Sequence, residues 1–264
     1  MILDDIIKNK KREVAALKKK RPLAALRRDV ESLPHKKRTF FQALKKNKKL
    51  SVIAEIKRMS PSKGIIRQDF DPVGIAREYE KAGATALSVL TDEKFFGGSG
   101  EIFKKVRRVS QLPILRKDFI LEEYQVYESR LLGADAILLI AAILPVRRLE
   151  RLRDISETFG LDVLFEVHTK SERDKVLSLK PQLLGINNRD LRTFEVDIHT
   201  TERLAKGLPK GVLLVSESGI QNQEDLVYLK SLGAKAVLVG ESLMKETDIR
   251  LALQRLLKGL DGKG

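Results

Sequence analysis

The 264-residue chain contains no cysteine, no tryptophan and only three histidines. Without cysteine there can be no disulfide, no thiolate nucleophile and no zinc–thiolate site. The histidines at 35, 168 and 199 are scattered, and the G-G-S-G at 97–100 lacks the G-x-G-x-x-G spacing of a dinucleotide-binding loop. We therefore expect neither a metal nor a cofactor.

Long apolar runs are also missing. No stretch of about eighteen apolar residues could cross a membrane, and no signal-peptide core precedes a cleavage site at the N-terminus. We therefore expect a cytosolic protein with no membrane partner. No linker rich in Ser, Gly or Pro divides the chain, which favours one main domain. A charged fraction of 33% without Cys or Trp is compatible with a heat-adapted source.

The net charge of +15 is concentrated at one end of the chain. Residues 1–50 hold 17 of the 51 basic residues and 5 of the 36 acidic ones, so this segment carries +12 and the remainder +3. A basic segment can be a solvated face, a contact for RNA or a membrane, or a lid over an anionic substrate. We favour a solvated face. Few aromatic residues are interleaved with the cations, which argues against a stacking platform for single-stranded nucleic acid.

The apolar residues of this basic segment recur at helical spacing. The pattern predicts an amphipathic helix over 3–17, a second short helix over 22–26 and a third apolar face over 40–44. An amphipathic helix needs a surface to cover. We therefore expect residues 1–50 to form a helical extension that packs on the main domain.

From residue 51 onwards, short apolar runs alternate with polar helical stretches. Eight runs are strand candidates: 51–57, 86–91, 113–117, 136–141, 162–167, 183–187, 212–216 and 236–240. They are nearly continuous in apolar residues, as buried parallel strands are. The pattern G-A-x-A recurs at Gly83, Gly133 and Gly233, where each glycine is predicted to end a helix in a left-handed cap. The rhythm predicts a single (β/α)8 TIM barrel over 51–264, with an open doubly wound sheet as the lesser alternative.

A barrel of this kind builds its active site at the C-terminal ends of its strands. Glu55 and Lys57 are two apart, so they point to the same side at the end of the first strand. Other strand ends offer polar groups, glycine turns or, at Phe119, an aromatic ring: Ser60, Lys117, Phe119, Glu166, Asn187, Arg189, Ser218, Gly219 and Gly240. Structural salt bridges are the alternative interpretation. The glycine turns after the last two strands favour a phosphate site, with the Glu241 side chain turned away.

Seven motifs occur in one order: A-E-I-K-R-M-S-P-S-K-G, P-I-L-R-K-D-F, G-A-D-A-I-L-L-I, F-E-V-H, G-I-N-N-R-D-L, S-E-S-G-I and V-G-E-S-L-M. Together they resemble indole-3-glycerol-phosphate synthase of tryptophan biosynthesis. The resemblance covers residues 51–245, and the basic helical extension also suits that family. It implies a lyase that converts 1-(2-carboxyphenylamino)-1-deoxyribulose 5-phosphate, an anionic phosphosugar, to indole-3-glycerol phosphate, CO2 and water without a cofactor.

The resemblance also implies catalytic roles for five residues. Lys117 matches the general acid that protonates the ribulose carbonyl, and a lysine that is charged at neutral pH can supply that proton. Lys57 matches the lysine that binds the acidic groups of the substrate and shares proton transfer. Glu166 matches the later general base and Glu55 the carboxylate that orients the lysines. Asn187 matches the amide that fixes Glu166 or substrate hydroxyls.

Two further sets of residues match binding positions of the family. The phosphate or substrate positions are Ser60, Arg189, Ser218, Gly219, Gly240 and Glu241. The apolar pocket for the anthranilate ring would be lined by Phe96, Phe119 and Leu138. His168, two residues beyond Glu166, is expected to be a hydrogen-bonded surface histidine.

Two other functions fit parts of the sequence. Phosphoribosylanthranilate isomerase would share the phosphate loops, but its acid/base pair usually resembles Cys and Asp, and this chain has no cysteine. A nucleic-acid-binding barrel would use the basic N-terminus and would lose salt-dependent binding when residues 1–45 are removed. We instead expect no nucleic-acid partner, a monomer, and a first helix that packs near the barrel mouth and helps to retain the substrate.

Overall fold

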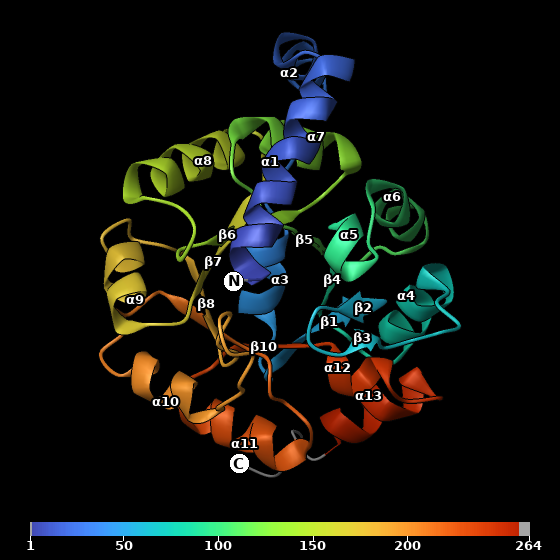
Figure 1. Ribbon diagram of the computed structural model, residues 1–264. Coiled ribbons are helices and arrows are strands. Elements are labelled where there is room, and N and C mark those ends of the chain that lie inside the picture. The colour runs from blue at the N-terminus through green and yellow to red at the C-terminus, as the bar shows by residue number, and fades with distance from the viewer. Residues whose placement is uncertain (1, 259–264) are drawn as a thin grey trace.

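Within residues 2–258, which the computed structural model describes, eight parallel strands close into a barrel (Figure 1). The strands are β1 (Ser51–Ile56), β4 (Ala86–Leu90), β5 (Ile114–Lys117), β6 (Ala136–Ile140), β7 (Asp162–Val167), β8 (Leu183–Asn187), β9 (Leu213–Glu217) and β10 (Ala236–Val239). Each pairs with the next in this series, and β10 pairs with β1 to complete the barrel. The predicted (β/α)8 barrel is confirmed and the open sheet is wrong. Residue 1 and residues 259–264 of the predicted segments lie outside the described residues.

One group of helices precedes the barrel in the chain, and another group surrounds it (Figure 1). The N-terminal ones are α1 (Ile2–Lys20), α2 (Leu23–Glu31) and α3 (Phe40–Lys46). The others are α4 (Pro72–Lys81), α5 (Glu93–Phe96), α6 (Gly100–Val109), α7 (Glu123–Leu132), α8 (Val146–Thr158), α9 (Lys170–Leu177), α10 (His199–Ala205), α11 (Gln223–Ser231), α12 (Glu241–Met244) and α13 (Ile249–Leu257). A hairpin that the sequence did not predict, β2 (Met59–Ser60) and β3 (Gly64–Ile65), follows β1. Among the described residues, no helix is long and apolar enough to span a bilayer.

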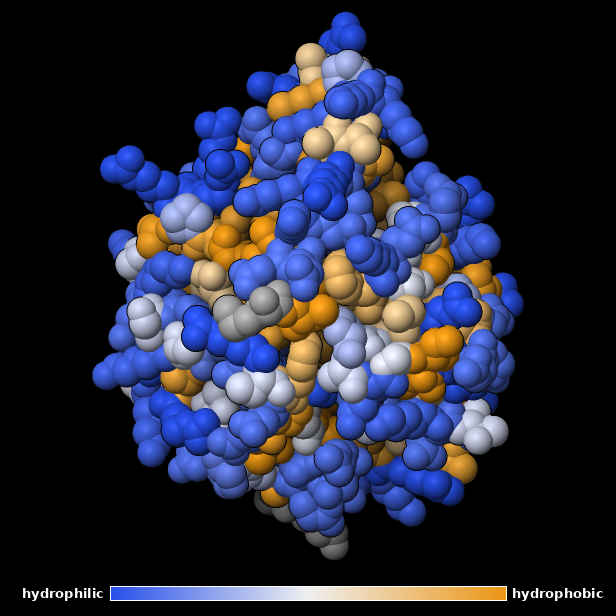
Figure 2. Space-filling view, viewed as in Figure 1, coloured by the Kyte–Doolittle hydropathy of each residue, from blue (hydrophilic) through white to orange (hydrophobic). Residues whose placement is uncertain are grey.

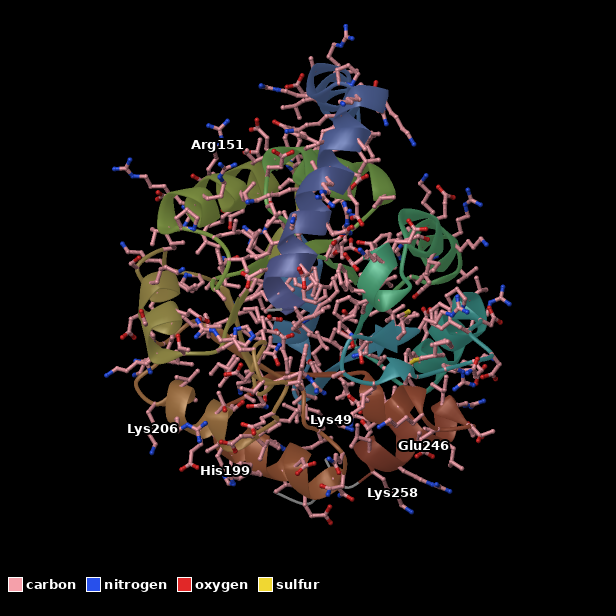
Figure 3. All side chains as sticks on the ribbon, viewed as in Figure 1. Lys49, Arg151, His199, Lys206, Glu246 and Lys258 are labelled. Carbon is pink, nitrogen blue, oxygen red and sulfur yellow. The ribbon has the colours of Figure 1, made fainter. Side chains whose placement is uncertain are left out.

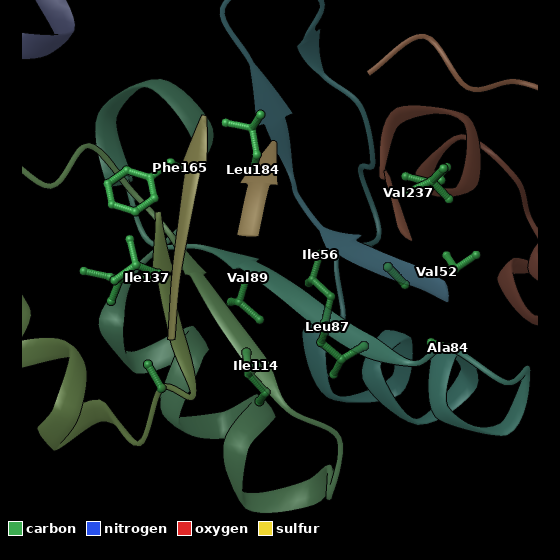
Figure 4. Close-up of a cluster of buried hydrophobic side chains, with 14 of the residues drawn as sticks. Val52, Ile56, Ala84, Leu87, Val89, Ile114, Ile137, Phe165, Leu184 and Val237 are labelled. Atoms are coloured by element: carbon green, nitrogen blue, oxygen red, sulfur yellow. The ribbon is translucent and has the colours of Figure 1, made fainter. Parts of the chain in front are cut away.

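Alternate residues of the strands belong to two separate apolar clusters. One cluster joins the outward-facing strand residues to the surrounding helices, and Figure 4 shows part of it, including Val52, Leu87 and Phe165. The other fills the barrel interior with residues such as Ile53 and Leu115. Because side chains alternate along a strand, the parity of each position decides which cluster it joins. The same parity selects the side chains that reach the mouth of the barrel.

The helix caps predicted from the G-A-x-A repeat are present. Gly83, Gly133 and Gly233 have φ values of 94°, 87° and 90°. This left-handed region is open to glycine at little cost. Each glycine therefore ends its helix and lets the chain enter the next strand within three residues.

The third N-terminal helix closes the bottom of the barrel. Phe40, Phe41 and Leu44 of α3 belong to the interior apolar cluster. The backbone N–H of Phe41 donates to Oδ2 of Asp162 at the start of β7, with an N···O distance of 2.9 Å. The predicted apolar face over 40–44 thus covers the N-terminal ends of the strands, opposite the active-site end.

The first helix reaches the other end of the barrel. Nζ of Lys10 lies 2.9 Å from Oδ2 of Asp92, which follows β4, and 3.0 Å from Oδ1 of Asp118, which follows β5. Burial alone would lower the pKa of Lys10, but Asp118 and Asp92 raise it above its usual value. Further along, Val14 packs with Tyr124 of α7. The side of α1 and α2 away from the barrel is mostly hydrophilic (Figure 2) and exposes Lys8, Lys11, Arg12, Lys19 and Lys20.

Lys10→Met is expected to destabilise the protein by about 3–5 kcal/mol, because it leaves buried carboxylates without their cation. Asp92, whose side chain has no exposed area, would bear most of this cost. Urea unfolding measures the free energy of unfolding, and the exposed neighbour Lys11→Met is the matched control, expected within about 0.5 kcal/mol of the parent. Equal stability of both variants would show that the buried cluster does not anchor α1.

Candidate active site

A cavity of about 550 Å³ opens at the C-terminal ends of the strands. Its wall contains all fourteen residues that the sequence singled out: Glu55, Lys57, Ser60, Phe96, Lys117, Phe119, Leu138, Glu166, Asn187, Arg189, Ser218, Gly219, Gly240 and Glu241. They come from all eight barrel strands and the segments that follow them. The fold therefore gathers residues that are up to 186 positions apart into one site.

Lys117 lies at the centre of the charged part of the cavity. Its Nζ is 2.9 Å from Oε2 of Glu166 and 2.5 Å from Oε2 of Glu217. Burial alone would lower the pKa of Lys117, but Glu166, Glu217 and Glu55 together raise it above its usual value. Lys117 is thus a cation held among buried carboxylates.

Glu217 is a site residue that the sequence analysis missed. Strand β9 extends to Glu217, one residue beyond the predicted run 212–216. Leu213 and Val215 face the barrel interior, so the two-residue period carries Glu217 inward as well. A Cβ atom at Gly185 of β8 would come within 2.2 Å of Oε1 of Glu217. Glycine at 185 therefore makes the room in which the Glu217 carboxylate lies.

Burial sets the acidity of Glu217. Its side chain is 1% exposed, and Oε1 has no hydrogen-bond partner. Burial raises the pKa of Glu217; Lys117 opposes the rise, and Glu166 adds to it by repulsion. A carboxyl group that binds a proton this readily, beside a lysine, suits a site that moves protons.

Glu55 and Lys57 form a second ion pair in the cavity. As their spacing predicts, they lie on the same side of the strand end, with 2.6 Å between Nζ of Lys57 and Oε2 of Glu55. A Cβ atom at Gly240 would lie 2.4 Å from Oε2 of Glu55. The glycine that follows β10 therefore allows Glu55 its position.

Glu166 contacts two cations, one at each carboxylate oxygen. Lys117 binds Oε2, and Nε2 of His168 lies 3.3 Å from Oε1. Burial alone would raise the pKa of Glu166, but Lys117 and His168 hold it well below its usual range. The expectation that His168 is a surface residue is wrong, because its side chain is 9% exposed and faces Glu166. The two-residue spacing of Glu166 and His168 could not reveal this contact, because it depends on the turn that brings the His168 ring back beside β7.

Cations and backbone turns occupy another part of the wall. Arg189 contacts Glu241 at 2.9 Å, and Glu241 also contacts Lys245 at 2.7 Å. The side chain of Glu241 therefore bridges two cations of the cavity wall, which offsets its repulsion of a bound anion. Ser218 and Gly219 both have positive φ, 67° and 81°. A non-glycine residue in this region, such as Ser218, is uncommon, and strained backbone of this kind clusters at functional sites.

The remaining wall is apolar. The rings of Phe96 and Phe119 are 5.9 Å apart at their centroids, and Leu138 lies at 2% exposure in the barrel interior. The segment after β8 adds apolar side chains that the sequence analysis did not select: Leu191, Phe194 and Val196. An aromatic ring of a ligand would fit this wall, because aromatic pairs tolerate offset and tilted contacts.

Within residues 2–258, no group of three or more His, Asp or Glu side chains is arranged to hold a metal ion. Asn187, at the end of β8, accepts a hydrogen bond at 3.0 Å from the backbone N–H of Arg189, which fixes the turn that carries the arginine. Together with the ion pairs, the turns and the apolar side chains described above, this gives the cavity proton donors and acceptors, an end suited to an anion and an apolar wall.

Comparison with solved structures places the fold among TIM-barrel enzymes. A thiamine phosphate pyrophosphorylase from Pyrococcus furiosus superposes with a TM-score of 0.60 at 17% identity, covering 80% of this chain and 96% of that one. An N-acetylmannosamine-6-phosphate 2-epimerase from Clostridium perfringens gives 0.60 at 16% identity, over 80% and 93%. At these identities the likeness concerns the fold alone.

Sequence comparison is more specific. The family model described as indole-3-glycerol phosphate synthase matches residues 3–256. A protein of that name from Caldanaerobacter subterraneus subsp. tengcongensis is 51% identical over 95% of this chain and 96% of its own length. Another, from Thermoanaerobacter pseudethanolicus, is 46% identical over the full length of both. The chain therefore belongs to the indole-3-glycerol phosphate synthase family of decarboxylating, ring-closing lyases.

Proposed function

We propose that this enzyme converts 1-(2-carboxyphenylamino)-1-deoxyribulose 5-phosphate to indole-3-glycerol phosphate, CO2 and water by general acid–base catalysis with lysine and glutamate. The observation that carries the proposal is the position of Lys117 between Glu166 and Glu217 in the cavity. A lysine kept protonated beside two carboxylates can donate a proton to a carbonyl oxygen and then be protonated again.

The three parts of this substrate match three parts of the wall. The anthranilate ring would lie against Phe96, Phe119 and Leu138. Its carboxylate would face Lys57. The phosphate would bind at the turn formed by Ser218 and Gly219, near Arg189, where backbone N–H groups and a guanidinium favour an anion.

In the first step, the ring carbon that bears the carboxylate attacks the ribulose carbonyl carbon. Lys117 gives its proton to the carbonyl oxygen, which becomes a hydroxyl group, while the nitrogen lone pair forms an iminium. Loss of CO2 then returns the electrons of the broken C–C bond to the iminium and restores the aromatic ring. The iminium of the closing ring thus accepts the electrons that the departing CO2 leaves behind.

In the second step, water leaves. Glu166 takes a proton from the carbon beside the ring nitrogen, and a lysine, Lys57 or Lys117, protonates the departing hydroxyl group. Glu55 holds Lys57 through the 2.6 Å ion pair, and the charge of Lys117 keeps Glu166 ionised for its role as base. The balance is one C–C bond formed, one C–C bond broken, one CO2 and one water released, and one proton taken up from solvent to reprotonate the lysine.

The direct test is an absorbance and fluorescence assay for indole-3-glycerol phosphate, made from the carboxyphenylamino-ribulose phosphate, with a chelator present. We expect turnover under these conditions. A protein that bound the substrate but gave no product at any temperature would exclude this reaction. Isomerisation of phosphoribosylanthranilate, assayed in parallel, would instead support the alternative barrel enzyme.

Glu241→Gln is expected to lower the KM for the substrate by up to about fivefold, because a partly exposed ion pair is worth about 1 kcal/mol or less. Burial alone would raise the pKa of Glu241, but Lys245 and Arg189 lower it, so the carboxylate is charged at neutral pH and competes with phosphate for both cations. Initial-rate kinetics measure KM, with the exposed Glu224→Gln as the matched control. A higher KM in Glu241→Gln would mean that the carboxylate is needed to orient Arg189.

A further inference from the structure

The two oxygens of Glu166 have different partners. Oε2 faces Nζ of Lys117 at 2.9 Å, and Oε1 faces Nε2 of His168 at 3.3 Å. Lys117 has to turn towards the substrate to donate its proton, and it then gives up part of its contact with Glu166. His168 is not on the cavity wall, so it can keep its contact while the substrate is bound.

A second carboxylate, that of Glu172, lies at the other ring nitrogen of His168. Oε2 of Glu172, on α9, accepts a hydrogen bond of 2.7 Å from the backbone N–H of His168 and lies 3.3 Å from its Nδ1. Thr169 caps α9 by accepting from the N–H of Glu172 at 3.2 Å. The turn after β7 is therefore fixed at both ends, and the ring lies between two carboxylates.

Helix capping alone does not explain this arrangement. A cap requires only the backbone N–H of His168 and the carboxylate of Glu172. The ring, in addition, is 9% exposed, and its Nε2 is buried without a well-aligned hydrogen bond. The 3.3 Å separation is slightly longer than a good N–H···O bond, so a small movement of Glu166 away from Lys117 would complete that bond.

We propose that His168, held by Glu172, is a positioning residue that keeps Glu166 ionised and oriented when Lys117 turns to the substrate. The inference rests on the proposed role of Glu166 as the base of the dehydration step. His168 touches no substrate in this scheme; it acts through Glu166.

The charges around His168 support a protonated ring. Burial alone would lower its pKa, but hydrogen bonding and attraction to Glu166 and Glu172 raise the pKa of His168 to about 9. Asp190, after β8, adds a third carboxylate near the ring, since His168 contributes to its lowered pKa. The cations opposite are Lys117 beside Glu166 and Lys175 near Glu172. The imidazolium is therefore present at neutral pH and lost as pH rises through about 9.

Proton NMR of the three histidines tests the charge directly in the full-length protein. The His168 signal, assigned by its absence in His168→Gln, is expected to titrate near pH 9, and its pKa is expected to fall in Glu166→Gln. His199, on α10 at the outer edge of the helical ring (Figure 3), also lies near a glutamate and is the matched control for the assignment of the signals. A His168 that titrates near pH 6.5 in both proteins would overturn the proposal.

Kinetics test the consequence for catalysis. His168→Leu is expected to lower kcat by about tenfold to hundredfold with little change in KM, the loss that a hydrogen bond to a charged group implies. His168→Gln, which keeps a neutral N–H donor, should recover part of kcat, and Glu172→Gln should show a smaller loss. The parent rate should fall above pH 9, and this fall should be absent in His168→Leu. His199→Gln should match the parent.

Glu166→Gln separates the two proposals. A large loss of kcat in Glu166→Gln combined with unchanged kcat in His168→Leu and Glu172→Gln would overturn the role of His168 and leave the role of Glu166 intact. An active Glu166→Gln would overturn the proposed base itself. If His168→Leu unfolds, the NMR titration and Glu172→Gln still decide, because neither requires that variant.

Discussion

Lys117→Met is expected to lower kcat by about a hundredfold to ten-thousandfold, because general acid catalysis typically contributes that much. Methionine keeps the length of the side chain but can neither donate a proton nor pair with Glu166 and Glu217. KM should change much less than kcat, since the proposed phosphate site, at Ser218, Gly219 and Arg189, lies elsewhere on the wall. Steady-state kinetics on the carboxyphenylamino-ribulose phosphate measure both constants.

Lys117→Arg distinguishes proton donation from charge. Arginine keeps the positive charge between the two glutamates but does not release a proton at working pH. We expect Lys117→Arg to fold as well as the parent and yet to lose nearly as much kcat as Lys117→Met. If the arginine variant kept most of the parent activity, Lys117 would act as a fixed charge and another group would be the acid.

The barrel could be predicted from sequence because its signals are local. Gly83, Gly133 and Gly233 each mark the end of a helix and the start of a strand, and this can be read without knowing any long-range contact. The eight apolar runs then leave little choice of topology. The hairpin of β2 and β3 gave no such signal, because each of its strands has two residues.

The site was predicted where strand parity and family motifs agreed. Glu55, Lys117 and Glu166 are all inward positions at strand ends, in line with Ile53, Leu115 and Leu164 of the interior cluster. Glu217 has the same parity signal, two residues after Val215, but the strand was ended one residue too early. The boundary of an element is the least reliable feature of a sequence pattern.

The contacts of the basic extension and of His168 could not be predicted for a different reason. An amphipathic pattern tells which face of α1 or α3 is buried but not what covers it. The ion pairs of Lys10 join positions more than 80 residues apart, and the ring of His168 reaches Glu166 only because the turn after β7 has one particular shape. Such contacts exist only in the folded chain.

Glu217→Gln is expected to lower kcat by about a hundredfold while leaving the protein at least as stable as the parent at pH 8. The amide has nearly the same shape, so the room beside Gly185 still accommodates it. What is lost is one of the negative charges that hold Lys117, the proposed general acid, 2.5 Å away, and a hydrogen bond to a charged group is worth about 1.5–3 kcal/mol. Kinetics and urea unfolding on the same preparations measure the two effects.

The effect of Glu217→Gln on the free energy of unfolding changes with pH in one direction. Because burial raises the pKa of Glu217 above its unfolded value, its proton binds more tightly in the folded state. The stability that this group contributes is complete below the unfolded pKa, near 4.5, and is lost as pH rises through the folded one. Glutamine never ionises, so the stability of Glu217→Gln relative to the parent should increase from pH 5 to pH 8. If the difference in the free energy of unfolding stayed constant across this range and the variant kept full activity, Glu217 would be an ordinary ion-pair partner. The expected result would instead show that the Glu217 carboxylate beside Lys117 lowers the stability of the folded protein.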